Sequence, residues 1–200
     1  MAMLMDSSMT FRLHLGIILA ALCLAGAASA DQRNSQKLIK IENGENRVDI
    51  VGDGTPGLVI SGHRENFNAH SFDVVSFYVQ ANAGGKQQWL VVPIMDSKGK
   101  KLDEKFELFV GGGADCLLND FRLLARNGAE PATLIVAERI KGDFVEREPI
   151  TFSYYTLVHN TDGDPGSVPY VFDLARVTTS KSNYCDVDEA MQTELGIGKP

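Results

Sequence analysis

The chain has 200 residues and a formal net charge of −7, with 26 acidic residues against 19 lysines and arginines. This acidic balance, together with the lack of any run of lysines and arginines, argues against nucleic acid or an anionic membrane surface as a partner. The length suits one domain with a sizeable hydrophobic core.

The N-terminus has the pattern of a secretory signal peptide. Arg12 precedes an apolar run from Leu15 to Leu24, and Ala28 and Ala30 form an A-x-A cleavage pattern. The run is shorter than the ~20 residues that cross a bilayer, so no membrane anchor is expected after cleavage. We predict a signal peptide over residues 1–30, a single β-rich domain over residues 31–200, and a periplasmic or secreted location.

Two cysteines, Cys116 and Cys185, remain once the segment that contains Cys23 is removed. An even count in an exported chain favours a disulfide, and two cysteines allow one internal pairing. The closed loop of about 70 residues would stabilise the fold by roughly 4 kcal/mol in the chain-entropy model. A metal–thiolate pair is the alternative.

Short β-prone runs follow one another along the chain after residue 37. Leu38–Ile41 and Val48–Val51 flank an Asn43-Gly44 turn signal, which predicts a hairpin. Pro93 indicates an edge position or a bulge in the run that contains it. Further strands are predicted at Phe72–Val79, Trp89–Met95, Phe106–Val110, Ala132–Val136, Ile150–Val158 and Tyr170–Val177.

The helical content is predicted near the C-terminus. Leu117–Leu124 is compatible with a short helix or with a strand. Asp186 precedes Glu189 by three residues, as in a capping box, and Gly196 is a helix terminator, which predicts a helix over Val187–Leu195. The spacing of all these elements favours a mainly β fold, a predominantly antiparallel β-sandwich or roll with one or two short helices.

The segment Val48–Ile60 resembles the Asp-rich calcium loop of integrin-like repeat proteins. Asp49 and Asp53 are the candidate calcium ligands, but calcium takes six to eight oxygens, so two carboxylates make a weak site. We interpret the segment as a turn in which Gly52, Gly54 and Gly57 supply unusual backbone angles.

The stretch Gly62–Asp73 is the main candidate site, because nearly every side chain in it can form hydrogen bonds although it lies between two apolar runs. Polar loops between strands often hold binding groups. Phe67 or Phe72 would add apolar contact, and the glycines at 111–113 would permit close approach. The candidate binding residues for a small carboxylate-bearing ligand are His63, Arg64, Asn66, Asn68, His70 and Asp115.

Two other interpretations of this stretch stay open. His63 and His70 could converge on a metal, with Asp73 or Asp115 as a third ligand. Alternatively, the polar groups form a network that fixes the fold or a dimer contact, with Arg64 in an ordinary ion pair. The sequence contains no G-x-S-x-G pattern, which argues against a serine hydrolase.

A resemblance to a known family is carried by three blocks, Ser61–Val79 (SGHRENFNAHSFDVVSFYV), Gly113–Leu124 (GADCLLNDFRLL) and Tyr184–Ala190 (YCDVDEA). Together they resemble the exported carbapenem intrinsic-resistance proteins of the CarG type. The resemblance implies a small periplasmic β-rich protein that forms a homodimer. It also implies protection of the cell from a β-lactam, either by binding the antibiotic or by a protective contact with its target, and it implies no catalytic residues.

We therefore expect a non-enzymatic protective protein with a β-lactam or another small carboxylate as its partner, and we predict no cofactor. The alternatives are a structural or interaction module of the cell envelope and, third, a metal-dependent hydrolase.

Overall fold

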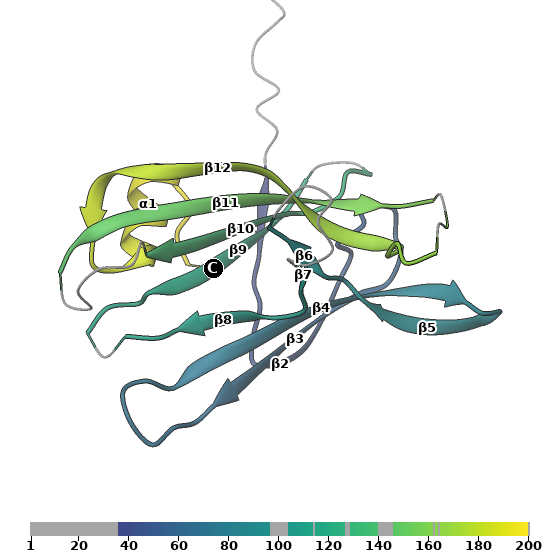
Figure 1. The fold of residues 1–200 in the computed structure, drawn as a ribbon, viewed down its shortest axis with the longest axis horizontal. Helices are drawn as coiled ribbons and strands as arrows, with labels where there is room; N and C mark the ends of the chain where they lie inside the picture. The colour runs from purple at the N-terminus through teal and green to yellow at the C-terminus, as the bar shows by residue number, and fades with distance from the viewer. Residues whose placement is uncertain are drawn as a thin grey trace, which may run out of the picture. The chain divides into compact units, whose positions relative to one another are not determined.

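The structure is a computed structural model that describes residues 36–96, 104–113, 115–126, 129–139, 146–161, 163 and 165–199. The expected signal peptide over residues 1–30 therefore lies outside the described residues. Figure 1 shows the strands and the helix of the described part. They are β1 (Lys37–Ile39), β2 (Gly44–Val48), β3 (Gly57–Arg64), β4 (Phe72–Ala83), β5 (Lys86–Val91), β6 (Ile94–Met95), β7 (Glu104–Lys105), β8 (Leu108–Gly111), β9 (Asn119–Ala125), β10 (Thr133–Arg139), β11 (Glu148–His159), β12 (Tyr170–Tyr184) and α1 (Val187–Leu195).

The described strands belong to one 12-stranded sheet in the order β2-β3-β4-β8-β9-β10-β11-β12-β6-β7, with β1 added to β9 and β5 added to β4. The pairings are antiparallel except for that of β6 with β12, which is parallel. The mainly β, predominantly antiparallel fold predicted from the sequence is therefore confirmed.

The segment around Pro93 connects two distant parts of the sheet. Val92 donates its N–H to the carbonyl of Phe77 in β4 at 2.8 Å, and Phe172 in β12 donates to the carbonyl of Pro93 at 2.9 Å. Proline has no N–H to donate, so regular pairing stops there and the chain passes from β5 to β6. The sheet folds over on itself without closing into a barrel, and the larger hydrophobic cluster fills the inside of the fold.

Strands β9 and β10 are buried on both faces. Leu123 and Leu134 belong to the larger cluster, whereas their neighbours Leu124 and Ile135 belong to a second cluster under α1. Successive side chains of a strand point to opposite faces, so these consecutive apolar residues are what a strand covered on both sides requires. Among the described residues, no helix has the length and apolar character needed to cross a membrane.

The helix α1 has the bounds predicted from the sequence. The side chain of Asp186 accepts a hydrogen bond of 2.8 Å from the backbone N–H of Asp188, and Gly196 ends the helix in the left-handed conformation with φ of 69°. The predicted capping box is only half formed, because Glu189 pairs with Arg147 at 3.0 Å instead.

The predicted disulfide between Cys116 and Cys185 is present, with its Cα atoms 5.3 Å apart. It attaches the connection between β8 and β9 to the residue that precedes the helix cap. Val187 adds a backbone hydrogen bond of 3.1 Å to the carbonyl of Leu117 at the same place. The bridge thus holds α1 on the sheet.

Two local predictions change in the structure. The predicted hairpin of Leu38–Ile41 with Val48–Val51 is wrong, because β1 pairs with β9 and β2 pairs with β3. The Asn46 side chain closes the intervening bend through hydrogen bonds of 2.8 Å to the backbone N–H and carbonyl of Glu42, so the bend forms without pairing between the two runs.

The ambiguous segment Leu117–Leu124 contains most of strand β9 and no helix. It is a strand because both of its faces meet hydrophobic clusters.

Candidate functional site

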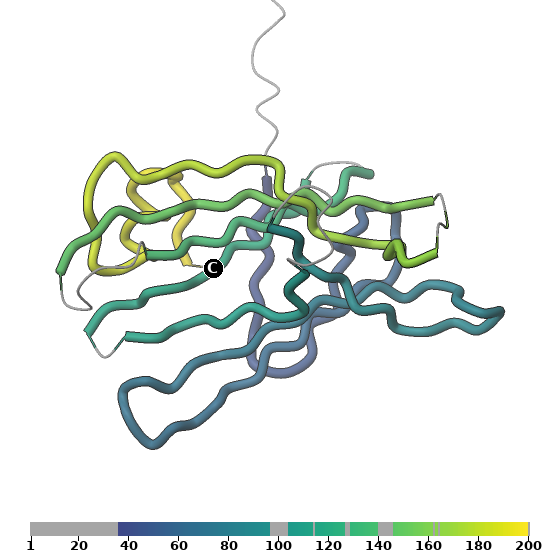
Figure 2. The backbone as a smooth tube through the Cα atoms, in the orientation of Figure 1, coloured from purple at the N-terminus to yellow at the C-terminus, as the bar shows by residue number. Residues whose placement is uncertain are grey.

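The polar stretch forms the end of the β3–β4 hairpin. His63 lies directly opposite Asp73, and Arg64 lies directly opposite Phe72. The β3–β4 loop (residues 65–71) and the β4–β5 turn are at opposite ends of β4, as Figure 2 shows. Since side chains alternate along a strand, His63 and Asp73 share the face of the buried Val75, whereas Arg64 and Phe72 share the other, outer face.

His63 lies between two carboxylates. Its Nδ1 is 2.7 Å from Oδ1 of Asp73, and its Nε2 is 3.6 Å from Oε2 of Glu65. The hydrogen bond with Asp73 raises the pKa of His63 above its usual value, and the charges of Asp73 and Glu65 add to that effect. Through these two contacts His63 joins the ends of β3 and β4 to the β3–β4 loop.

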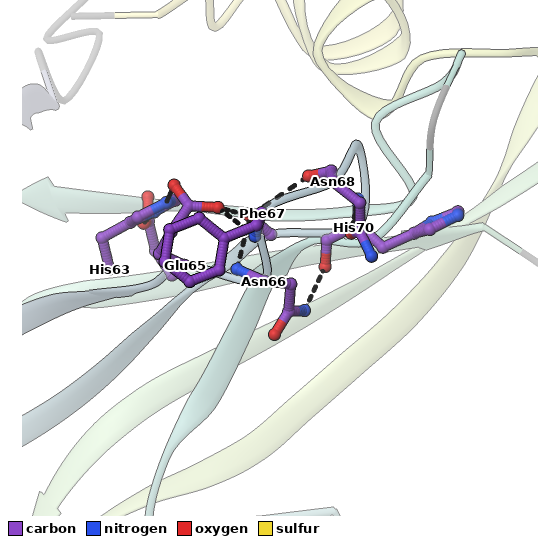
Figure 3. Close-up of polar contacts among 8 residues, drawn as sticks. His63, Glu65, Asn66, Phe67, Asn68 and His70 are labelled. Atoms are coloured by element: carbon purple, nitrogen blue, oxygen red, sulfur yellow. Dashed lines mark hydrogen bonds and ion pairs between the residues drawn. The ribbon is translucent and has the colours of Figure 1, made fainter.

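The β3–β4 loop is held by hydrogen bonds among its own residues (Figure 3). Oε1 of Glu65 accepts from the Ser71 hydroxyl at 2.8 Å, and the Ser71 hydroxyl accepts the backbone N–H of Asn66 at 3.0 Å. The hydrogen bond from Ser71 is the largest cause that lowers the pKa of Glu65, and the backbone N–H of Phe67 adds to this effect. Asn66 Nδ2 donates to the carbonyl of His70 at 2.9 Å, and Asn68 Oδ1 accepts the N–H of His70, also at 2.9 Å. The two asparagines, predicted as ligand-binding residues, thus hold the loop backbone.

Phe67 stands out at the tip of the β3–β4 loop. Its φ of 56° is positive, and it is the one non-glycine residue of the described chain with a positive φ. Its side chain is 94% exposed, and its N–H donates to Oε1 of Glu65 at 2.5 Å. A left-handed conformation is unfavourable for a residue with a Cβ, and exposure of a phenyl ring is unfavourable as well. From the sequence alone, Phe67 was expected only to add an apolar contact to a ligand.

An aromatic strip continues from the loop on the outer face of the sheet; we define it as Arg64, Phe72 and Phe109. The guanidinium carbon of Arg64 lies 5.3 Å from the centre of the Phe72 ring, and the Phe72 and Phe109 rings meet edge to face at 5.5 Å. The side chain of Phe109, in β8, is 53% exposed. Within the described residues Arg64 forms no ion pair, so the strip combines aromatic surface with an uncompensated positive charge.

The triple glycine and Asp115 have separate positions. Gly111 lies opposite Phe72, where an added Cβ would be 3.3 Å from the carbonyl oxygen of Ser71, so the close approach it permits is to β4. The carbonyl oxygen of Asp115 lies 4.0 Å from Sγ of Cys185. The structure therefore places Asp115 beside the disulfide and gives it no hydrogen bond in the described part of the loop network.

The two histidines do not converge. In Figure 3 the imidazole of His70 points away from His63, on the other side of the β3–β4 loop. Within the described residues, no group of three His, Cys, Asp or Glu side chains is placed to hold a metal ion. The metal interpretation of His63 and His70 therefore does not fit this arrangement.

The candidate calcium residues form a turn. Asp49 accepts the N–H of Gly52 at 2.6 Å through one carboxylate oxygen and that of Gly54 at 2.7 Å through the other. A groove of about 220 Å³ lies at this turn, lined by residues 47–49 and 54–57. It is at the start of β3, about 23 Å from Arg64 at the rise of an extended strand, so it is not part of the β3–β4 loop.

Comparison with known proteins agrees with the fold and with the resemblance described above. The model of the CarG-like family, described as "Carbapenem resistance protein CarG-like", matches residues 41–193. The crystal structure of CarG is similar to this chain with a TM-score of 0.64 and 24% identity, over 78% of this chain and 94% of that chain. At this identity the likeness shows the shared fold. No curated protein matches the chain.

The family match covers β2 to β12 and most of α1, and so includes the β3–β4 loop, the aromatic strip and the disulfide. It contains in full all three blocks that carried the resemblance, Ser61–Val79, Gly113–Leu124 and Tyr184–Ala190. This protein belongs to the CarG-like family of carbapenem resistance proteins.

Proposed function

We propose that this chain is an exported, non-enzymatic protein that protects the cell from a carbapenem by non-covalent binding. The observation that carries the proposal is the β3–β4 loop, which is bonded to itself and leaves Arg64, Phe67 and His70 exposed. Family membership links the chain to carbapenem resistance. The disulfide supports an oxidising location such as the periplasm.

The contacts within the loop favour binding over bond cleavage. Nucleophilic catalysis needs a hydroxyl or thiol hydrogen-bonded to a base such as histidine. The Ser71 hydroxyl is bonded to Glu65, and the two ring nitrogens of His63 face Asp73 and Glu65. No nucleophile–histidine pair is thus assembled from the described residues of this hairpin.

Two modes of protection remain, capture of the drug and contact with the enzyme that the drug inactivates. Small-molecule sites are concave and cover most of their ligand. Phe67 instead stands 94% exposed at the loop tip, which favours contact with a larger surface. Arg64 supports capture as the second candidate, because its guanidinium could bind a carboxylate in bidentate fashion.

The test compares a carbapenem-susceptible bacterial host with and without the full chain in a panel of β-lactams. We expect a higher inhibitory concentration for carbapenems when the chain is present. Unchanged ultraviolet absorbance of a carbapenem incubated with purified residues 31–200 would support protection without turnover, whereas steady loss that stops with chelator would support a metal-dependent hydrolase. Equal susceptibility with and without the chain would contradict the proposal and favour an envelope interaction module.

A homodimer is part of this proposal, as the resemblance implies. Light scattering of purified residues 31–200 measures it directly, and a monomer at micromolar concentration would contradict it.

A further inference from the structure

We propose that Phe67 is the anchor with which this protein docks into an apolar pocket, rimmed by carboxylates, on the enzyme that the carbapenem inactivates. This inference rests on the proposed function and names its partner. It assigns the β3–β4 loop as the docking element.

Phe67 is unfavourable for the isolated fold in two ways. Its φ of 56° is a conformation that asparagine and glycine adopt far more readily, and its ring is 94% exposed to water. The loop contains asparagine on both sides, at 66 and 68, so the local backbone already uses the residue type that suits this conformation. A phenyl ring at this position is best explained by a contact outside the chain.

The β3–β4 loop presents Phe67 in a fixed position. Oε1 of Glu65 accepts both the N–H of Phe67 at 2.5 Å and the hydroxyl of Ser71 at 2.8 Å. The hydrogen bonds of Asn66 with Ser71 and of Asn68 with His70 complete the loop. A loop that is already ordered loses little conformational entropy on binding, so more of the contact energy appears as affinity.

The shape and charge of the loop tip indicate the kind of partner surface that would bind it. A protruding ring needs a concave pocket, and aromatic side chains that fill such pockets dominate the energy of protein interfaces. Glu65 and Asp73 both contact His63, whereas Arg64 forms no ion pair within the described residues, so its guanidinium is the cation beside the tip that a partner's carboxylate can pair with. Complementarity then requires carboxylates at the rim of the pocket.

A bilayer is a weaker match than a protein. Stable attachment to a membrane surface needs a broad apolar face or several basic residues, and the described loop has one exposed phenyl ring beside one arginine. The aromatic strip extends the contact along the sheet through Phe109, which is 53% exposed and meets Phe72 edge to face. The contact surface is therefore the loop tip with the strip at its base.

The test uses Phe67→Asn, which removes the ring and keeps a residue suited to the left-handed conformation. Phe106→Asn is the matched control, because Phe106 is 51% exposed and lies outside both the loop and the strip. Binding is measured with purified extracytoplasmic domains of the host's carbapenem-binding transpeptidases. We expect Phe67→Asn to weaken binding about 30-fold or more and to abolish protection, with Phe106→Asn like the wild type.

Two further variants test charge and mode of contact. Arg64→Gln is expected to weaken binding less and to reduce its dependence on salt concentration. Since Trp89 is the chain's single tryptophan, Phe67→Trp in a Trp89→Phe background reports on the tip alone. Its fluorescence is expected to shift to the blue with a transpeptidase domain and to stay unchanged with phosphatidylglycerol vesicles or with a carbapenem alone.

The outcomes separate this inference from the proposed function. If Phe67→Asn protects the cell as well as the wild type does, the docking role is overturned and the proposed function stands. The same conclusion follows if the wild type protects the cell but binds none of the transpeptidase domains. The docking role is also overturned if the fluorescence shifts to the blue only with vesicles. It is overturned too if Phe67→Asn changes nothing except the self-association of this protein. Phe67-dependent binding to a transpeptidase without any protection would support the docking role and contradict the proposed function.

Discussion

The Nδ1 atom of His63 lies 2.7 Å from Oδ1 of Asp73, its direct cross-strand partner at the end of the β3–β4 hairpin. This contact joins two strands at the point where the loop leaves the sheet. It also places a group that titrates near neutral pH next to the proposed docking element.

The first prediction concerns the pH dependence of this contact. The pKa of His63 in the folded protein is raised above its value in the unfolded chain, which is about 6.5. The stabilisation is therefore fully present below about pH 6.5 and is lost as the pH rises through the folded pKa. An NMR titration of the His63 ring is expected to give a pKa that falls in Asp73→Asn. An unchanged pKa in that variant would contradict the contact.

The second prediction concerns the Arg122 side chain, which is 3% exposed. Its guanidinium contacts Asp120 at 2.7 Å, Asp188 of α1 at 2.6 Å and the carbonyl of Gly198 at 3.0 Å, so it fastens the helix and the following residues to β9. Arg122→Met leaves the carboxylate of Asp120 without an ion pair and leaves Asp188 with Lys199 alone, and it is expected to cost about 3–5 kcal/mol in the free energy of unfolding. Urea titration measures this cost.

The control for Arg122 is Lys40→Gln, which removes an exposed ion pair with Glu42. It is expected to change the free energy of unfolding by less than about 1 kcal/mol. Similar losses in the two variants would show that the buried network contributes no more than a surface pair.

The third prediction concerns the disulfide, which joins residues 69 positions apart. The double variant Cys116→Ser/Cys185→Ser is expected to lose about 2–5 kcal/mol of stability because its unfolded chain is less constrained. Reductant should then lower the melting temperature of the wild type and leave that of the variant unchanged. Two free thiols in the unreduced, denatured protein would be incompatible with the bridge.

The fourth prediction concerns the strain at Phe67. Because its φ is 56°, Phe67→Asn is expected to raise the free energy of unfolding by about 1 kcal/mol. Phe106 has no positive φ, so Phe106→Asn is the control in which no strain is relieved. Thermal or urea unfolding measures both, and a large loss of stability in Phe67→Asn would mean that the ring supports the fold itself.

Some features of this protein follow from short stretches of sequence. The bounds of α1 were predicted correctly because Asp186 and Gly196 act on the backbone within one helical turn. The alternation of Phe72–Val79 predicted a strand for the same reason, since the faces of a strand depend only on successive residues. Two cysteines in the chain after residue 30 left one internal pairing, and the structure contains it.

Other features required the tertiary structure, because they depend on which distant segments meet. The partner of β1 is β9 rather than β2, since Leu38 and Ile39 pack against hydrophobic clusters formed far along the chain. The sequence showed that the stretch Gly62–Asp73 was polar, but the hydrogen-bond partners of each group emerge only when the hairpin is closed. Folding satisfies Asn66 and Asn68 within the loop and leaves the Phe67 ring in solvent, because hydrogen-bond geometry, not composition, decides which side chains remain available for a partner.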